Sequence, residues 1–195
     1  MRRRVAILIA VTVCLAVCTR AQTSRIAPPV PLEVNLAYSA DRTNGLAGGY
    51  GCFWMSGAKA EVNANFAYGW SVVAELAGEH ASNINSAHED LSLVSYLFGP
   101  RYSYRGARRL VPFAQFLVGG VHGFDALFPG YSGAPPNAFA FATGGGLNAH
   151  LSRRFALRLV QADYFQTQLP NDANNRQDHL RLSGGVVFRF GEEGR

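Results

Sequence analysis

Apolar and polar residues alternate with a period of two along most of the chain, in long runs separated by turn-forming residues. In the last run, Val186, Phe188 and Phe190 fall on one face, whereas Arg181 and Arg189 fall on the other. A two-residue period is that of a β-strand whose two faces meet different environments. No long run has the 3.6-residue period of an amphipathic helix, so the pattern predicts an all-β fold.

Eight such runs are predicted to be strands: residues 32–40, 53–67, 70–80, 89–104, 111–124, 138–151, 155–166 and 179–190. The connections between them alternate in length. Those at residues 41–52, 81–88, 125–137 and 167–178 are long, and those at 68–69, 105–110 and 152–154 are short. This alternation is typical of an up-and-down meander with one plain end and one elaborated end. The runs exceed the usual strand length of about 5–6 residues and suit a tilted membrane span.

The residue types on the two faces indicate which face is inside. One face carries the charged residues together with many Gly, Ala, Ser and Asn residues, which fit within a narrow eight-stranded barrel. The other carries most of the aromatic residues, which would overfill such an interior. A charge at the lipid midplane costs roughly 2–4 kcal/mol for Arg or Lys, so we expect the charged face inside. The sequence therefore predicts an eight-stranded antiparallel up-and-down transmembrane β-barrel, and the alternative is a soluble sandwich or barrel with an aromatic core.

This assignment of faces gives two sets of candidate residues. The inward charges should pair across the lumen, because an isolated buried charge is costly. This predicted lumen charge network consists of Lys59, Glu61, Glu75, Glu79, Arg101, Arg158, Arg181 and Arg189. A membrane-interface girdle is expected near the short connections, formed by Tyr68, Trp70, Tyr102, Tyr104, Phe155, Phe188 and Phe190. Arg158 and Asp163 have opposite parity in their run, which predicts a β-bulge near Val160 and Gln161.

The N-terminal residues predict export. A cationic start is followed by a short apolar run over residues 5–17 and a small-residue cleavage site at Ala21, the pattern of a cleaved signal peptide over residues 1–21. The apolar run is shorter than the roughly 20 residues of a transmembrane helix. Residues 22–31, with three prolines, predict an irregular segment before the first strand, and residues 191–195 a short polar tail. The residues before Cys18 leave its lipidation open as a minor alternative.

Cleavage changes what charge and cysteine content imply. Four of the 18 basic residues would leave with the signal peptide, so 14 basic residues would face 13 acidic ones, a net charge of +1. This removes the main support for nucleic-acid binding. Cys52 would be the remaining cysteine, so no intramolecular disulfide is expected. The pairs Arg108-Arg109 and Arg153-Arg154 fall in short turns, where we expect them to be solvated or to touch lipid headgroups.

Residues 32–190 resemble the transmembrane domain of small OmpA/OmpX-type outer-membrane β-barrel proteins. The resemblance is carried by FGPRYSYRG (98–106), VPFAQFLVGG (111–120), GGGLNAHLSRRFALRLVQADY (144–164) and RLSGGVVFRFG (181–191). The C-terminal positions Ser183, Gly185, Phe188 and Phe190 resemble the signal by which such barrels are recognised and inserted. The resemblance implies an outer-membrane location, contact with outer-membrane lipid and lipopolysaccharide, and insertion by the barrel-assembly machinery. Because the sequence ends after the eighth run, we expect a stand-alone barrel without the peptidoglycan-binding domain of full-length OmpA.

The fold hosts several activities, so three functions are considered. The first is a monomeric structural or surface-interaction barrel, with termini and short turns in the periplasm and long loops that bind an unknown extracellular ligand. The second is a narrow gated pore through rearranged ion pairs. The third is a lipid A-modifying enzyme, because His80, Ser82 and Glu89 resemble the residue set of outer-membrane lipid A deacylases, though with a different Ser-to-Glu spacing. We expect no cofactor and no catalytic residues. We also expect no metal site, since the five histidines do not have the spacing of metal ligands.

Overall fold

The computed structural model describes residues 31–44, 52–67, 69–84, 90–106, 109–124, 137–170 and 175–191. The predicted signal peptide, residues 22–30, residues 192–195 and part of each long connection lie outside these ranges. Among the described residues, no helix has the length and apolar character needed to cross a membrane.

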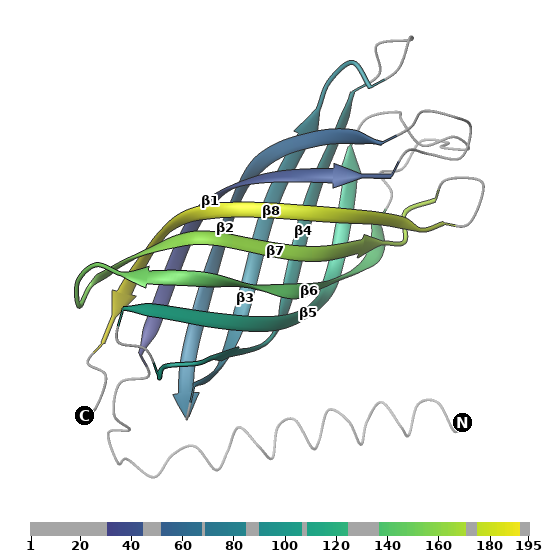
Figure 1. Ribbon diagram of the computed structural model, residues 1–195. Helices are drawn as coiled ribbons and strands as arrows, with labels where there is room; N and C mark the ends of the chain where they lie inside the picture. The colour runs from purple at the N-terminus through teal and green to yellow at the C-terminus, as the bar shows by residue number, and fades with distance from the viewer. Residues whose placement is uncertain are drawn as a thin grey trace, which may run out of the picture.

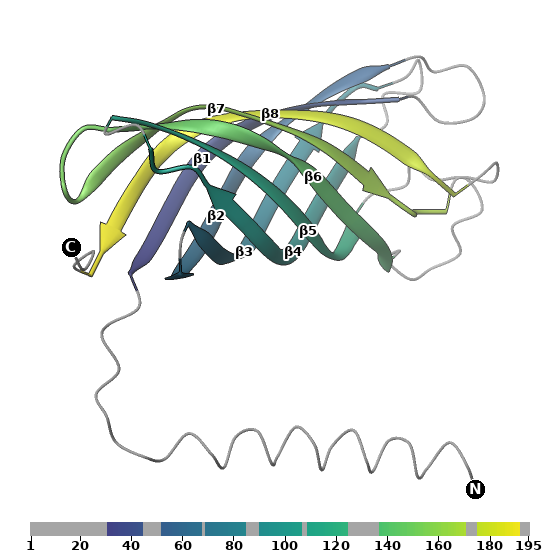
Figure 2. The same ribbon diagram turned by 60° about the horizontal axis from the view of Figure 1, so that its bottom comes forward.

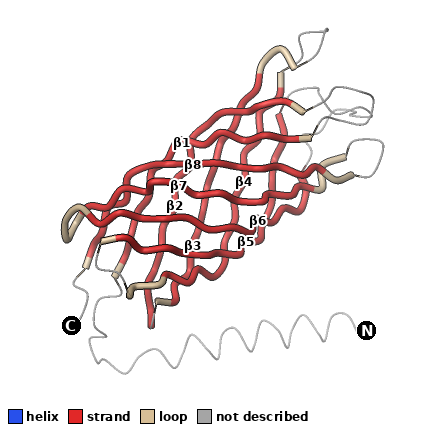
Figure 3. The backbone as a smooth tube through the Cα atoms, viewed as in Figure 1, coloured by secondary structure: helices blue, strands red, loops and turns tan. Residues whose placement is uncertain are grey.

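Eight strands form one closed antiparallel barrel in which each strand pairs with its neighbours along the chain and β8 closes on β1 (Figure 1). The strands are β1 (Leu32–Thr43), β2 (Phe53–Ala67), β3 (Trp70–Ala81), β4 (Leu91–Ser103), β5 (Leu110–Phe124), β6 (Asn137–His150), β7 (Phe155–Thr167) and β8 (Gln177–Phe190). Nearly all of the described backbone is strand (Figure 3). The predicted all-β, up-and-down, eight-stranded barrel is confirmed.

The two ends of the barrel differ. β1 begins and β8 ends at the same end, where Leu32 pairs with Phe190, and the three short connections lie at this end too (Figure 2). We call it the short-turn end. The strands joined through residues 45–51, 85–89, 125–136 and 171–174 meet at the opposite end, which we call the loop end.

Closure between β1 and β8 depends on a glycine on the inner face. A Cβ atom added at Gly185 would lie 2.1 Å from the carbonyl oxygen of Leu36 and 2.6 Å from the Cα of Ala37 on β1. Such distances are far below van der Waals contact, so any side chain here would push the two strands apart. Gly185 therefore allows the tight curvature at the strand pair that closes the barrel.

Several strands extend further toward the loop end than the sequence indicated. β1 runs to Thr43 instead of Ala40, and β8 begins at Gln177 instead of His179. The predicted boundaries were wrong because they followed the apolar residues, whereas polar side chains continue the inward alternation here. Asp41, Thr43 and His179 are all buried inside the barrel. The predicted long connections are correspondingly shorter at these ends.

The faces alternate as predicted, with charge inside and apolar residues outside. Glu61 is 1% exposed, whereas Leu76 on the opposite face of the sheet is 57% exposed. The expected irregularity in β7 is present, since the register against β8 shifts between Arg158 and Gln161. This bulge turns both Arg158 and Asp163 inward, although their spacing in the sequence gives them opposite parity.

Candidate functional site: the filled lumen and the two ends of the barrel

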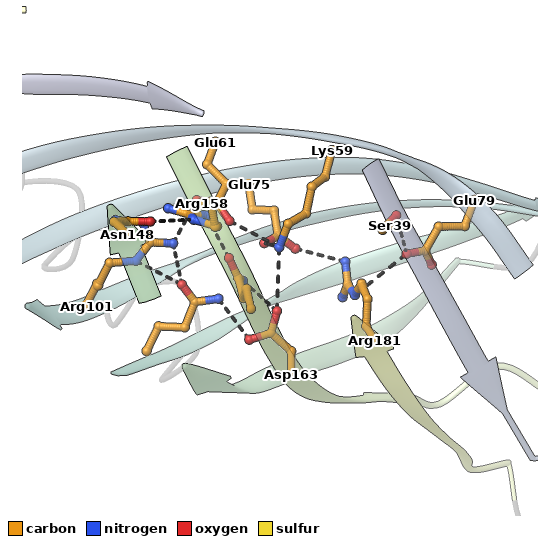
Figure 4. Close-up of polar contacts among 12 residues, drawn as sticks. Ser39, Lys59, Glu61, Glu75, Glu79, Arg101, Asn148, Arg158, Asp163 and Arg181 are labelled. Carbon is orange, nitrogen blue, oxygen red and sulfur yellow. Dashed lines mark hydrogen bonds and ion pairs between the residues drawn. The ribbon is translucent and has the colours of Figure 1, made fainter. Parts of the chain in front are cut away.

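Glu61 is the centre of one half of the charge network in the lumen (Figure 4). Its Oε2 atom accepts hydrogen bonds from Arg101, at 2.8 Å, and from Arg158, and its Oε1 atom lies 3.2 Å from Lys59 Nζ. These cations come from β2, β4 and β7, so one carboxylate on β2 links three strands. All four side chains are buried, which makes each charge dependent on the others.

Lys59 joins this half of the network to the other half. Its Nζ atom lies 3.2 Å from Glu75 Oε2 and 3.6 Å from Asp163 Oδ2, in addition to its contact with Glu61. Figure 4 shows the ammonium group between these three carboxylates. On the far side of Glu75, Arg181 Nη1 lies 3.0 Å from Oε1, and Arg181 Nε lies 3.7 Å from Glu79. The chain of ion pairs therefore runs across the whole lumen.

Neutral polar side chains complete the network. Gln115 Oε1 accepts from Arg101 Nε at 3.0 Å, and Asn148 Oδ1 accepts from Arg158 Nε at 3.1 Å. Gln161 Nε2 donates to Asp163 at 2.6 Å, and Ser39 Oγ donates to Glu79 at 3.2 Å. With these residues, each of the eight strands contributes at least one side chain. In this network four basic side chains (Lys59, Arg101, Arg158, Arg181) face four acidic ones (Glu61, Glu75, Glu79, Asp163).

Two phenylalanine side chains inside the barrel lie against arginines, an arrangement that was not expected from the sequence. The guanidinium carbons of Arg101 and Arg158 lie 4.5 and 4.7 Å from the ring centroid of Phe113. Arg181 lies 4.1 Å from the ring centroid of Phe165 in the same way. Cation–π contact compensates part of the desolvation of buried guanidinium groups. The expectation that aromatic residues would overfill the lumen was wrong for these two, because a flat ring stacks against a flat guanidinium group.

An apolar cluster fills the lumen toward the loop end. It includes large side chains from β4 and β5, namely Leu91, Leu93, Leu97, Leu117 and Val121, together with Met55, Phe165 and Leu169. All of these are buried. The lumen thus has two layers, a charged network in the middle and an apolar plug above it. Beside them, Asp41 Oδ2 lies 3.2 Å from His179 Nδ1, and both side chains are buried.

The outer surface has aromatic residues near both ends. At the short-turn end, Trp70 and Tyr102 stack with ring centroids 5.1 Å apart, and Phe155 and Phe188 with centroids 5.4 Å apart. Tyr104 and Phe190 are also exposed there, whereas Tyr68 lies outside the described residues. At the loop end, Trp54, Phe124, Phe139 and Tyr164 are exposed among the described residues. Between these girdles the outward side chains are mainly aliphatic and aromatic, as Leu36, Val62, Leu76 and Phe98 illustrate.

Similar structures share this architecture. No protein-family model and no curated protein matches the sequence. Neisserial surface protein A (NspA) matches with a TM-score of 0.63 and 13% identity, over 82% of this chain and 97% of that one. Ail, the attachment invasion locus protein of Yersinia pestis, matches with a TM-score of 0.57 and 17% identity, over 83% and 99% of the two chains. OprG of Pseudomonas aeruginosa matches with a TM-score of 0.51 and 13% identity, over 84% and 97%.

The chain has the fold of the small eight-stranded outer-membrane barrels. Within this outer-membrane barrel fold, seven of the eight residues predicted for the lumen network lie together in the buried network described above. Arg189 lies apart, at the short-turn end, where its Nε atom is 3.3 Å from Glu33 Oε1. Four further members of the network, Asp163, Gln115, Gln161 and Asn148, were not predicted from the sequence. The alternation within their strands places Gln115 and Asn148 on the inner face, so both could have been predicted. Asp163 could be placed there only once the position of the bulge in β7 was known.

The four residues predicted to form a C-terminal insertion signal divide between the two faces of the barrel. Ser183 is buried on the inner face and Gly185 lies on the same face, while Phe190 is exposed on the outer face close to the end of β8. Phe188 lies on the outer face and stacks on Phe155. These four positions therefore combine a glycine that lets two strands pack closely on the inner face with aromatic side chains on the outer face.

The structure describes two of the three residues that suggested an enzyme, His80 and Ser82. His80 Nδ1 lies 2.9 Å from the hydroxyl of Ser92, on the exposed outer face near the loop end. Ser82 is exposed just beyond β3, and Glu89 lies outside the described residues. Within the described ranges, no group of three or more His, Cys, Asp and Glu side chains is arranged to hold a metal ion.

Proposed function

We propose that the protein is a stand-alone outer-membrane β-barrel with a closed lumen and a structural or surface-interaction role. The observation that carries this proposal is the combination of an exposed apolar belt outside with a buried network of ion pairs inside. Exposed apolar surface of this extent is unfavourable in water but matches the hydrocarbon core of a bilayer. Two aromatic girdles at its edges fit the two membrane–water interfaces.

The proposed topology places the short-turn end, with the start of β1 and the end of β8, in the periplasm. The four long connections at the loop end, predicted at residues 41–52, 81–88, 125–137 and 167–178, then face the outside and carry any ligand specificity. This arrangement follows the usual asymmetry of bacterial outer-membrane barrels. The names of two similar structures, a surface protein and an attachment invasion locus protein, support a surface role. In this proposal the barrel is a monomer, and its outer surface contacts outer-membrane lipid and lipopolysaccharide.

Labelling of Cys52 on intact cells tests the topology and the location together. Cys52 is a free, exposed thiol at the loop end, immediately before β2. A membrane-impermeant maleimide is expected to label it without opening the cells. The matched variant Cys52→Ser/Arg153→Cys moves the thiol to an exposed position at the short-turn end and is expected to react only after the outer membrane is permeabilised.

The reverse labelling pattern would overturn the proposed orientation. Labelling of neither variant in the membrane fraction, with the protein instead in the soluble periplasmic fraction, would overturn the membrane assignment itself. A shift in gel mobility on boiling checks that each variant is folded, since folded outer-membrane barrels resist detergent until heated.

The pore alternative meets an obstacle in the filled lumen. A permeating ion would have to break ion pairs around Lys59 and also pass the apolar cluster at Leu97 and Leu117. We therefore expect the folded protein to add no steady conductance to a planar bilayer. Discrete conductance steps that change in size in the variant Glu75→Ala would contradict a closed lumen and favour the gated pore.

A further inference from the structure

Three exposed arginines lie at one side of the short-turn end. Arg153 and Arg154 occupy the turn between β6 and β7, and Arg109 precedes β5. All three are exposed, and within the described residues none of them has an ion-pair partner. We call these three residues the arginine patch.

Backbone hydrogen bonds bring the three residues together. The carbonyl oxygen of Arg109 accepts from His150 N at 2.8 Å, which places Arg109 beside the end of β6, where the turn begins. The carbonyl oxygen of Arg154 accepts from Arg189 N, also at 2.8 Å, which ties the turn to β8. The patch therefore spans the short-turn ends of four neighbouring strands, β5 to β8.

The turn that presents two of the arginines is held in one conformation. The carbonyl oxygen of Phe155 accepts from Leu151 N at 3.1 Å and from Ser152 N at 3.0 Å. The hydroxyl of Ser152 in turn accepts from Arg154 N at 3.3 Å and from Phe155 N at 3.1 Å. Because the backbone is already ordered, binding of a ligand at this turn would lose little backbone entropy.

The surface next to the patch is apolar and exposed. Leu151, in the same turn, is 72% exposed, and Leu110, Phe155 and Phe190 are exposed beside it on the outer face. The arginines thus stand immediately beyond the edge of the apolar belt, at the level of an interfacial girdle. A molecule with a negative headgroup and hydrocarbon chains would match both parts of this surface.

Acidic residues do not neutralise the patch in the described part of the chain. Among the described residues, Glu33 is the carboxylate at this end, and it is held by Arg189 at 3.3 Å and by Asn63 Nδ2 at 3.0 Å. The loop end differs, because Arg176 there pairs with Asp178 at 3.0 Å.

We propose that the arginine patch and the adjoining apolar side chains form a docking surface for anionic phospholipid of the periplasmic leaflet. Its phosphate would meet Arg109, Arg153 and Arg154, and its acyl chains would lie along Leu151 and Phe155. This inference rests on the proposed topology, which places the short-turn end at the phospholipid leaflet. A phospholipid fits better than a soluble anion because the cations border an apolar surface that faces lipid.

Phosphatidylglycerol retention by the purified full-length barrel tests the proposal. The folded protein in mild detergent is titrated with phosphatidylglycerol or with phosphatidylcholine of the same acyl chains, and bound lipid is counted by native mass spectrometry. We expect preferential binding of phosphatidylglycerol, weakened about fivefold for each arginine removed. The variant Arg109→Gln/Arg153→Gln/Arg154→Gln should therefore lose about 100-fold in affinity, and the Arg→Lys version of the same variant should keep most of it.

The matched control is Arg42→Gln, which removes an exposed arginine from the outer face at the loop end. It should leave phosphatidylglycerol binding unchanged. Equal retention of the two lipids by the wild type, or undiminished phosphatidylglycerol binding by the triple glutamine variant, would overturn the inference. The labelling of Cys52 on intact cells separates this failure from failure of the proposed function, since a correctly oriented barrel without lipid preference would leave the topology standing.

Discussion

Replacing Glu61 by glutamine is expected to lower the free energy of unfolding by about 3–5 kcal/mol, the range for breaking a buried ion-pair network by removing one partner. Glu61 is the shared carboxylate of Lys59, Arg101 and Arg158, and its side chain is fully enclosed. The amide cannot offset the charge of the three cations, and all three are buried. The loss should greatly exceed that of one exposed salt bridge.

Urea unfolding in detergent micelles, followed by gel mobility without boiling, measures this effect. The matched control is Glu33→Gln, which removes the carboxylate of the partly exposed pair with Arg189 at the short-turn end. That variant should lose no more than about 1 kcal/mol, because solvent screens the pair. Equal and small losses in both variants would contradict a network on which the barrel depends.

Replacing Leu76 by arginine is expected to destabilise the barrel in a lipid bilayer by about 2–4 kcal/mol, the range for a cation at the midplane of a transmembrane barrel. Leu76 lies at the middle of β3 on the outer face, between Ala60 on β2 and Tyr96 on β4. An arginine there would place its guanidinium group in hydrocarbon, far from either interface.

The control variant also introduces an arginine on the outer face of β3, but at a different height in the membrane. His80→Arg places the same charge four residues further toward the loop end, beside the hydroxyl of Ser92 at the proposed interface. There the cost should fall to about 0–1 kcal/mol. Both variants are unfolded with urea from phospholipid vesicles, and folded protein is scored by its mobility. If Leu76→Arg is as stable as the wild type, the outer face of the barrel is not in contact with lipid.

The identity of the strands was predictable because it is a local property. A period of two persists through every run, and the turn residues between runs have strong conformational preferences, so all eight strands were found. The ends of β1 and β8 were not, since Asp41, Thr43 and Gln177 read as loop residues. Their place in the strands depends on an enclosed polar interior, which exists only once the barrel has closed.

The alternation of polar and apolar residues could not predict which charged residues pair with one another. Arg158 contacts Glu61, which lies 97 residues earlier in the sequence. Alternation indicates that both point inward, but not that they lie at the same height in the lumen. That height depends on the stagger between successive strands, summed around the barrel, and on the bulge between Arg158 and Gln161.

The sequence by itself determined the fold class, the eight strands, the direction of the two faces and the bulge in β7, because each follows from residue type and spacing within one strand. The tertiary structure alone decided which charges meet, that Phe113 and Phe165 lie against arginines inside, and that leucines gather in a buried cluster toward the loop end. It also decided that Arg109, Arg153 and Arg154 share one surface. These features join residues that are distant in the chain, and only the closure and stagger of the barrel bring them to the same place.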